Sequence, residues 1–144
     1  MSRGFTLVEL VVVLAIAGVS AAVAVPALGR LLDQEPAPAA PVVELLHRAR
    51  RTALERAVPV TVTLLPASGR YWVWAEERGG RTTLAEGLLA LPAGTRLAAS
   101  GPRVRVRFDP AGRAAGDTVA VWAAAGGTRV TVDPWTGAVD VAAR

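Results

Sequence analysis

One long apolar run dominates the first third of the chain. It begins at Phe5, extends to about residue 32, and carries a single charge, Glu9, before Arg30. As a helix these residues would measure about 42 Å, whereas crossing a bilayer takes only about 20 apolar residues. The pattern predicts one membrane-spanning helix, which we place at residues 5–34.

A second, shorter helix is expected after a break in the chain. Residues 35–41 contain three closely spaced prolines, which favour an extended connector and disfavour helical geometry in the residues before them. In residues 42–57 apolar positions recur at helical spacing, so one face should be buried. That face comprises Leu45, Leu46, Ala49, Ala53, Leu54 and Ala57.

Beyond residue 58 the pattern changes to a period of two. Short alternating runs are separated by turn-forming residues, and Gly126-Gly127 is expected to form a hairpin turn. The fold class is therefore α+β, with residues 42–144 forming a head in which the helix packs on a mostly antiparallel sheet. We expect strands at 60–64, 71–76, 88–91, 103–108, 118–124, 128–132 and 138–141, with loop elsewhere in residues 82–100.

The residues around the start of the apolar run form a recognisable motif. Gly4-Phe5-Thr6-Leu7-Val8-Glu9 resembles the cleavage and methylation site of type IV prepilins and type II secretion pseudopilins. In that family a prepilin peptidase cuts after the glycine and methylates the new terminal amine. The resemblance implies that residues 1–4 are a leader, that cleavage falls between Gly4 and Phe5, and that Phe5 becomes N-methylated.

Glu9 is costly where it stands, because a carboxylate at mid-membrane costs roughly 2.5–3.5 kcal/mol, though less near an end. After cleavage it would lie four residues from the Phe5 amine, on the same helix face. The positive end of the helix dipole also favours an acid in the first turn, by about 0.3–1 kcal/mol. The resemblance further implies that Glu9 pairs with the Phe5 amine of a neighbouring subunit during filament assembly.

Two positions weaken the long helix. Pro26 lacks an N–H and crowds the preceding turn, and Gly18 costs roughly 1 kcal/mol relative to alanine in a helix interior. The resemblance implies a partly extended stretch between them in the filament. The alternative is that both are simply residues common in membrane helices.

Two later segments extend the resemblance. Phe108-Asp109-Pro110-Ala111-Gly112-Arg113 and Val132-Asp133-Pro134-Trp135-Thr136-Gly137 are similar to the C-terminal half of the GspH/FimT-like minor subunits. This implies a minor pilin or pseudopilin, single-pass in the inner membrane with a periplasmic head, assembled into a pilus or pseudopilus. The implied partners are other pilin subunits, the prepilin peptidase, the inner-membrane assembly platform, and membrane lipid before assembly.

Composition argues against catalysis. The chain has no cysteine and one histidine, His47, which we expect at the surface of the second helix. No phosphate-binding loop, dinucleotide-binding glycine pattern or histidine-based zinc motif is present. We therefore expect no enzyme activity, no metal and no cofactor. The net charge of +4 is compatible with anionic partners and equally with an ordinary surface.

One basic pattern leaves a second function open. Arg103, Arg105 and Arg107 alternate with apolar residues and, in a strand, would form a stripe about 13 Å long that suits phosphate contacts. The three arginines are then either an ordinary solvated strand face or the DNA-contacting surface of a minor pilin for competence. The end of the chain, 142–144, lacks the basic cluster expected of DNA-binding relatives. A further alternative is a Sec-exported soluble binding domain, with residues 22–24 as the cleavage site.

Overall fold

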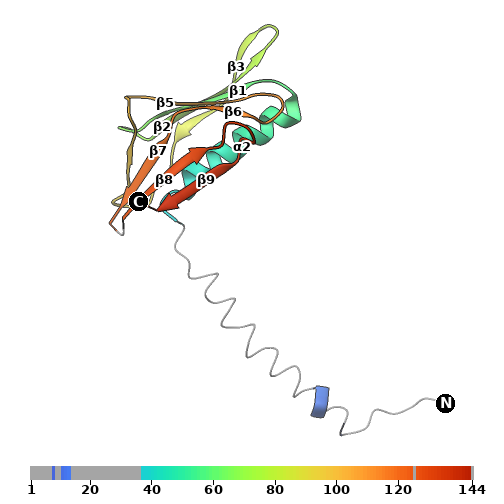
Figure 1. Cartoon of the computed structure of the whole chain (residues 1–144), viewed down its shortest axis with the longest axis vertical. Coiled ribbons are helices and arrows are strands. Elements are labelled where there is room, and N and C mark those ends of the chain that lie inside the picture. The colour runs from blue at the N-terminus through green and yellow to red at the C-terminus, as the bar shows by residue number, and fades with distance from the viewer. Residues whose placement is uncertain (1–7, 9–10, 14–36, 125, 144) are drawn as a thin grey trace, which may run out of the picture. The chain divides into compact units, whose positions relative to one another are not determined.

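The computed structural model describes residues 8, 11–13, 37–124 and 126–143 (Figure 1). The chain divides into two units, residues 1–37 and residues 38–144. In the first unit only Val8, residues 11–13 and residue 37 are described, and the first four of these are helical. No helix within the described part of the chain is long and apolar enough to span a membrane. Most of the expected span at 5–34 lies outside that part.

The second unit begins with helix α2 (Ala40–Arg56), two residues earlier than expected. Pro41 lies in its first turn, where the missing N–H costs no helical hydrogen bond. The helix ends at Arg56, and the next residue, Ala57, caps it with a left-handed φ of 52°. The expected face is confirmed at Leu45, Leu46, Ala49 and Ala53, which are buried. It is wrong at its C-terminal end, because Leu54 is 46% exposed and Ala57 is also exposed.

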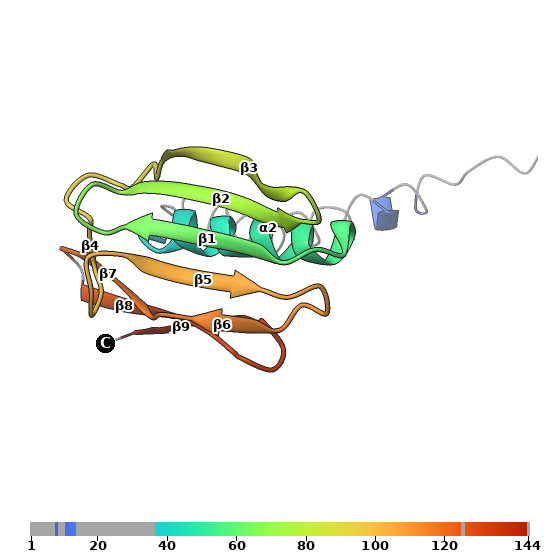
Figure 2. The ribbon, with the colours of Figure 1, turned by 90° about the horizontal axis from the view of Figure 1, so that it is seen from above.

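A five-stranded antiparallel sheet covers one side of this helix (Figure 2). Its strands lie in the order β3-β2-β1-β5-β6, so β1 is paired with β2 on one side and with β5 on the other. The strands are β1 (Val60–Leu65), β2 (Arg70–Glu77), β3 (Gly80–Leu88), β5 (Val104–Phe108) and β6 (Ala114–Gly116).

The remaining strands form a second antiparallel sheet in the order β4-β7-β8-β9. The sequence pattern predicted antiparallel strands but not their division between two sheets. These strands are β4 (Arg96–Ala98), β7 (Val119–Ala123), β8 (Gly126–Val132) and β9 (Val139–Ala143).

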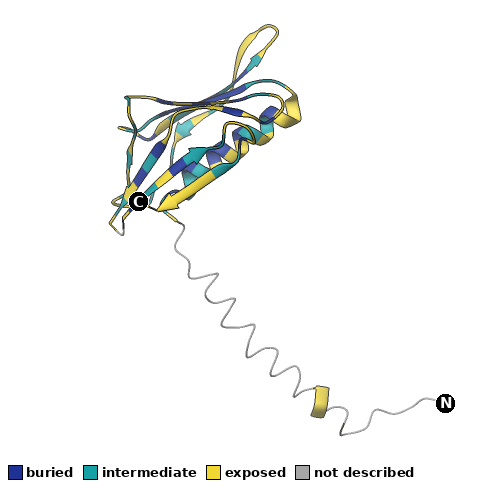
Figure 3. Ribbon diagram, in the orientation of Figure 1, coloured by how far each residue is buried: buried dark blue, intermediate teal, exposed yellow. Residues whose placement is uncertain are grey.

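The hydrophobic core lies where α2 meets strands of both sheets, since the helix contacts β1, β5 and β9 (Figures 1 and 3). Strand β5 shows why its sequence alternates: its apolar residues are buried and its arginines are exposed. Phe108 is completely buried. The other fully or almost fully buried large side chains are Val42, Val60, Val106, Val121 and Val130.

Three expectations about strands were wrong. The stretch 82–100 holds most of β3 and all of β4, whereas a single strand at 88–91 was expected. Strand β6 was not expected, because an Ala-Ala-Gly sequence carries no β-branched or aromatic signal. Gly126 and Gly127 belong to β8 and pair with β7. A side chain at Gly127 would overlap the ring of Trp122, so a larger residue there would require that ring to move.

Candidate functional site

The residues predicted for processing and assembly are Gly4, Phe5, Glu9, Gly18 and Pro26. All five lie outside the described residues. Their roles therefore stay predictions, and the geometry below concerns the head.

The arginine stripe is only partly formed. Arg105 and Arg107 lie on the exposed face of β5, but Arg103 precedes the strand, which begins at Val104. Arg107 donates to the carboxylate of Glu76 on β2 across the sheet, at 2.6 Å. One of the three expected cations is thus paired and another is outside the strand, which weakens the stripe as a phosphate-binding surface.

Two tryptophans of β2 share one face of the first sheet, opposite to the buried residues of that strand. Trp72 and Trp74 are half-buried, while Val73 between them is buried. The guanidinium of Arg70 lies 5.4 Å from the ring centroid of Trp72, and that of Arg81 lies 5.7 Å from the centroid of Trp74. These distances suit cation–π contacts, so both rings already have basic partners within the head.

Residues 108–113, the first of the two head segments that resemble the family, form a turn ordered by Asp109. Its carboxylate accepts hydrogen bonds from the backbone N–H groups of Ala111 and Arg113, both at 2.9 Å, and from Arg113 Nε at 2.8 Å. Partial desolvation raises the pKa of Asp109, but the hydrogen bonds and charge of Arg113 outweigh it and hold that pKa below its ordinary value. The charged form of Asp109 therefore stabilises the turn.

The second segment forms a similar turn around Asp133. One carboxylate oxygen, Oδ1, accepts from the N–H of Trp135 at 3.0 Å, the N–H of Thr136 at 2.7 Å and the Thr136 hydroxyl at 2.8 Å. The hydrogen bonds from Thr136 hold the pKa of Asp133 below its ordinary value. The turn leaves the Trp135 side chain 78% exposed.

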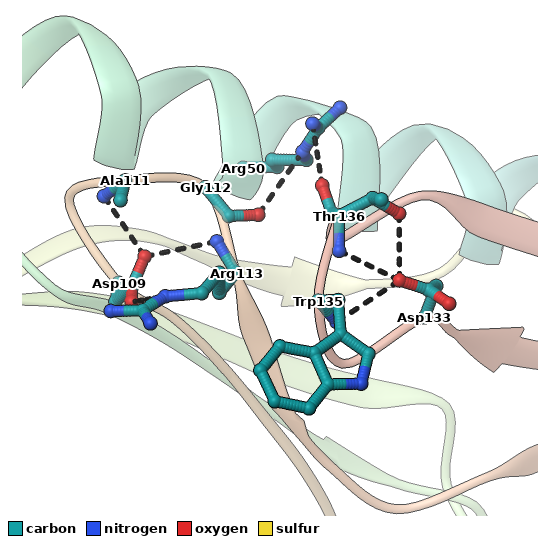
Figure 4. A network of polar contacts seen from close by, with 8 residues as sticks. All are labelled: Arg50, Asp109, Ala111, Gly112, Arg113, Asp133, Trp135 and Thr136. Atoms are coloured by element: carbon teal, nitrogen blue, oxygen red, sulfur yellow. Dashed lines mark hydrogen bonds and ion pairs between the residues drawn. The ribbon is translucent and has the colours of Figure 1, made fainter.

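Arg50 of α2 joins both turns (Figure 4). Its Nε donates to the carbonyl oxygen of Gly112 at 3.3 Å, and its Nη2 donates to the carbonyl oxygen of Thr136 at 2.6 Å. Gly137 lies directly against the Gly112 carbonyl, where a side chain would overlap the oxygen. Sequence reasoning missed Arg50, because its partners are 62 and 86 residues away along the chain.

The described part of the head offers no recognisable catalytic arrangement. No three His, Cys, Asp or Glu side chains there come together as a metal site would need. His47 is exposed on α2, as expected. What the head does present is a fixed surface, made of one helix and two turns that converge on Arg50.

The head is a helix packed on antiparallel sheets, and in the sequence it follows a long apolar run with a prepilin-like start. Together these features define the class of minor pilins and pseudopilins. Residues 1–25 match the prokaryotic N-terminal methylation motif. Residues 39–137, from the start of α2 through the second turn, match the model of the Type II transport protein GspH. The chain belongs to this GspH family and is a minor pilin or pseudopilin subunit.

Solved structures share the fold. The type IV minor pilin FimU of Pseudomonas aeruginosa aligns with a TM-score of 0.55 at 14% identity, over 70% of this chain and 85% of that one. The minor pseudopilin EpsH from the Type 2 Secretion System of Vibrio cholerae aligns with a TM-score of 0.53 at 14% identity, over 71% and 90%. No curated protein sequence matches significantly. The competence and Sec-export alternatives gain no support from these comparisons.

Proposed function

We propose that this subunit is made as a prepilin, cleaved between Gly4 and Phe5, and methylated on the new Phe5 amine. Residues 5–34 then hold it in the inner membrane, with the head of residues 42–144 in the periplasm, until the assembly platform draws it into a pilus or pseudopilus. The observation that carries this proposal is the presence, in one chain, of the methylation motif at residues 1–25 and a GspH head at residues 39–137.

The charge balance of the mature N-terminus gives Glu9 a role in assembly. Methylation leaves the Phe5 amine cationic, and an unpaired carboxylate in an apolar environment is costly. Pairing Glu9 with the amine of the adjacent subunit offsets the desolvation of both charges. The same pairing fixes the axial position of one apolar helix against the next.

The head, in this proposal, acts by contact with other subunits and performs no catalysis. This is supported by the two segments that resemble the family, residues 108–113 and 132–137. Each forms a turn in which an aspartate carboxylate accepts hydrogen bonds from backbone N–H groups. Such a head would serve as a rigid structural part of the filament.

The proposal is tested on the full chain in cells that assemble the filament. Mass determination of the mature protein should find an N-terminus at Phe5 carrying one added methyl group. A start after Ala24, or retention of Met1, would contradict the proposal.

Glu9→Ala provides a second test. This variant should be cleaved and inserted into the membrane as the wild type is, yet be missing from sheared filaments. Glu44→Ala is the matched control, because Glu44 is an exposed acid that pairs with Arg48 on the surface of α2. Normal incorporation of Glu9→Ala would refute the pairing, whereas loss of both variants would show that the defect is not specific to Glu9.

A further inference from the structure

Strand β3 leaves one edge of the first sheet open. It is last in the strand order and pairs only with β2 (Figure 2). Whereas β4 and β6, at two other sheet edges, have three residues each, β3 runs from Gly80 to Leu88. Proteins commonly protect an edge by keeping its strand short or by placing proline or several charges on it. β3 has no proline and only two charged residues, Arg81 and Glu86, so its edge can accept a further strand.

A bulge in β3 places its two charged residues on the same face. The register between β2 and β3 skips Leu84, which has no partner on β2. Residues five positions apart in a regular strand would face opposite sides of the sheet. With one extra residue between them, Arg81 and Glu86 both lie on the face that carries Trp72 and Trp74.

The backbone groups of Arg81 and Glu86 point to the open edge. Just beyond the strands, the N–H of Leu89 donates to the carbonyl oxygen of Gly69 at 2.9 Å, which marks a hydrogen-bonded position. Bonded and non-bonded positions alternate along an antiparallel pair. Glu86 therefore occupies a non-bonded position relative to β2, and counting across the bulge gives the same result for Arg81.

Two copies of β3 complement each other about a two-fold axis. If Arg81 of one copy lies opposite Glu86 of the other, symmetry places Glu86 of the first opposite Arg81 of the second. The same register puts Thr82 opposite Ala85, and each of these pairs joins residues of one face, as antiparallel pairing requires. A register with Arg81 opposite itself would bring like charges together, which is destabilising.

The charges around this edge favour the same partner. Glu86 makes no ion pair with any residue that the structure describes. Arg81 lies 4.0 Å from the carboxylate of Glu76, which Arg107 already engages at 2.6 Å. A second copy would give Glu86 a cation and would give Arg81 a carboxylate of its own.

We propose that two copies of this chain associate through β3, which pairs with itself in the antiparallel direction and joins the two first sheets into one continuous sheet. Backbone hydrogen bonds between the two edges hold the dimer, as in other cases of strand addition. The two Arg81–Glu86 contacts set its register. The contact area of one strand on another is small, so the dimer is a reversible one. This inference does not depend on the function proposed above.

The first experiment uses the absence of native cysteine. Thr82→Cys and Ala85→Cys are made in two differently tagged full-length chains, which are mixed in detergent and oxidised. In the proposed register these positions form a non-bonded pair with Cα atoms about 4.5 Å apart, within the range of a disulfide. The mixture should therefore give a disulfide-linked dimer that contains both tags.

Two controls test the register. Thr82→Cys alone should give no disulfide, because the two copies of residue 82 are displaced along the strands. A mixture of Thr82→Cys with Leu88→Cys, at another position of the same edge, should also give none. Equal yields from the test mixture and either control, or no product from the test mixture, would overturn the inference.

The second experiment measures the dissociation constant of the full chain in detergent by sedimentation equilibrium. The wild type should show a monomer–dimer equilibrium. Arg81→Glu should weaken it about tenfold, because two like-charge pairs replace two opposite-charge pairs. Combining Arg81→Glu with Glu86→Arg should restore association, although it does not restore the contact of Arg81 with Glu76. This rescue separates a contact between copies from local damage to β3.

Arg51→Glu is the matched control, since it makes the same charge change at an exposed position of α2. It should dimerise as the wild type does. A wild type that stays monomeric, a dimer unaffected by Arg81→Glu, or a charge swap that fails to restore association would each refute the pairing of β3 with itself.

Discussion

Replacing Gly137 with alanine tests how the two turns and α2 hold one another in place. Gly137 has φ of 64°, and a Cβ there would overlap the carbonyl oxygen of Gly112. That same oxygen accepts from Arg50 Nε. A methyl group at position 137 therefore forces the two turns apart at the point where Arg50 joins them.

The expected loss has two parts. Holding a non-glycine residue in the left-handed region costs roughly 1–2 kcal/mol. Separating the turns also weakens hydrogen bonds made by a charged group, which contribute about 1.5–3 kcal/mol. Gly137→Ala should therefore lower the free energy of unfolding by about 3–4 kcal/mol, a large part of the stability of a small domain.

Gly69→Ala is the matched control. Gly69 has nearly the same φ, 69°, but open space where its Cβ would lie. It should cost only about 1 kcal/mol, from the backbone alone. Urea unfolding of the full chain in detergent, followed by tryptophan fluorescence, measures both variants, because all four tryptophans (Trp72, Trp74, Trp122 and Trp135) lie in the head.

A double-mutant cycle with Arg50→Gln isolates the shared part. Because Arg50→Gln already removes the hydrogen bonds to both turns, Gly137→Ala should cost clearly less in that background than in the wild type. Equal losses for Gly137→Ala and Gly69→Ala, or strict additivity with Arg50→Gln, would refute the view that these three elements are energetically coupled.

Two further predictions concern the charged groups of the head. The folded-state pKa values of Asp109 and Asp133 lie below their unfolded values. Their contribution to stability is therefore complete above the unfolded pKa near 3.9 and is lost as pH falls through the folded values. Asp133→Asn should flatten the loss of stability to urea measured from pH 5 down to pH 3, and an unchanged pH profile would contradict this. Because Arg107 is paired with Glu76, replacing Arg103, Arg105 and Arg107 together with glutamine should leave unchanged any retention of the chain on duplex DNA over a salt series; a clear loss of retention would instead support the stripe as a phosphate-binding surface.

The division between what the sequence predicts and what it misses follows the range of the interactions. The helical spacing in residues 42–57 and the alternation in β1 and β5 depend on neighbours a few residues apart, so both could be predicted. The spacing of Leu54 fits the buried helix face, yet Leu54 is 46% exposed in the fold. Strand β6 pairs with β5 through backbone groups alone, and its small side chains give no signal.

The sequence by itself determined the family, through the prepilin-like start and the two Asp-Pro turn segments, because these motifs are local and their residue order carries the information. Only the tertiary structure decided the rest. It divided the strands between two sheets, brought Glu76 to Arg107, and let Arg50 on α2 hold two turns far along the chain. Glu76 meets Arg107 because β2 and β5 both pair with β1, and Arg50 reaches the two turns because they lie beside α2 in the fold. The local order of residues does not record which distant segments become neighbours.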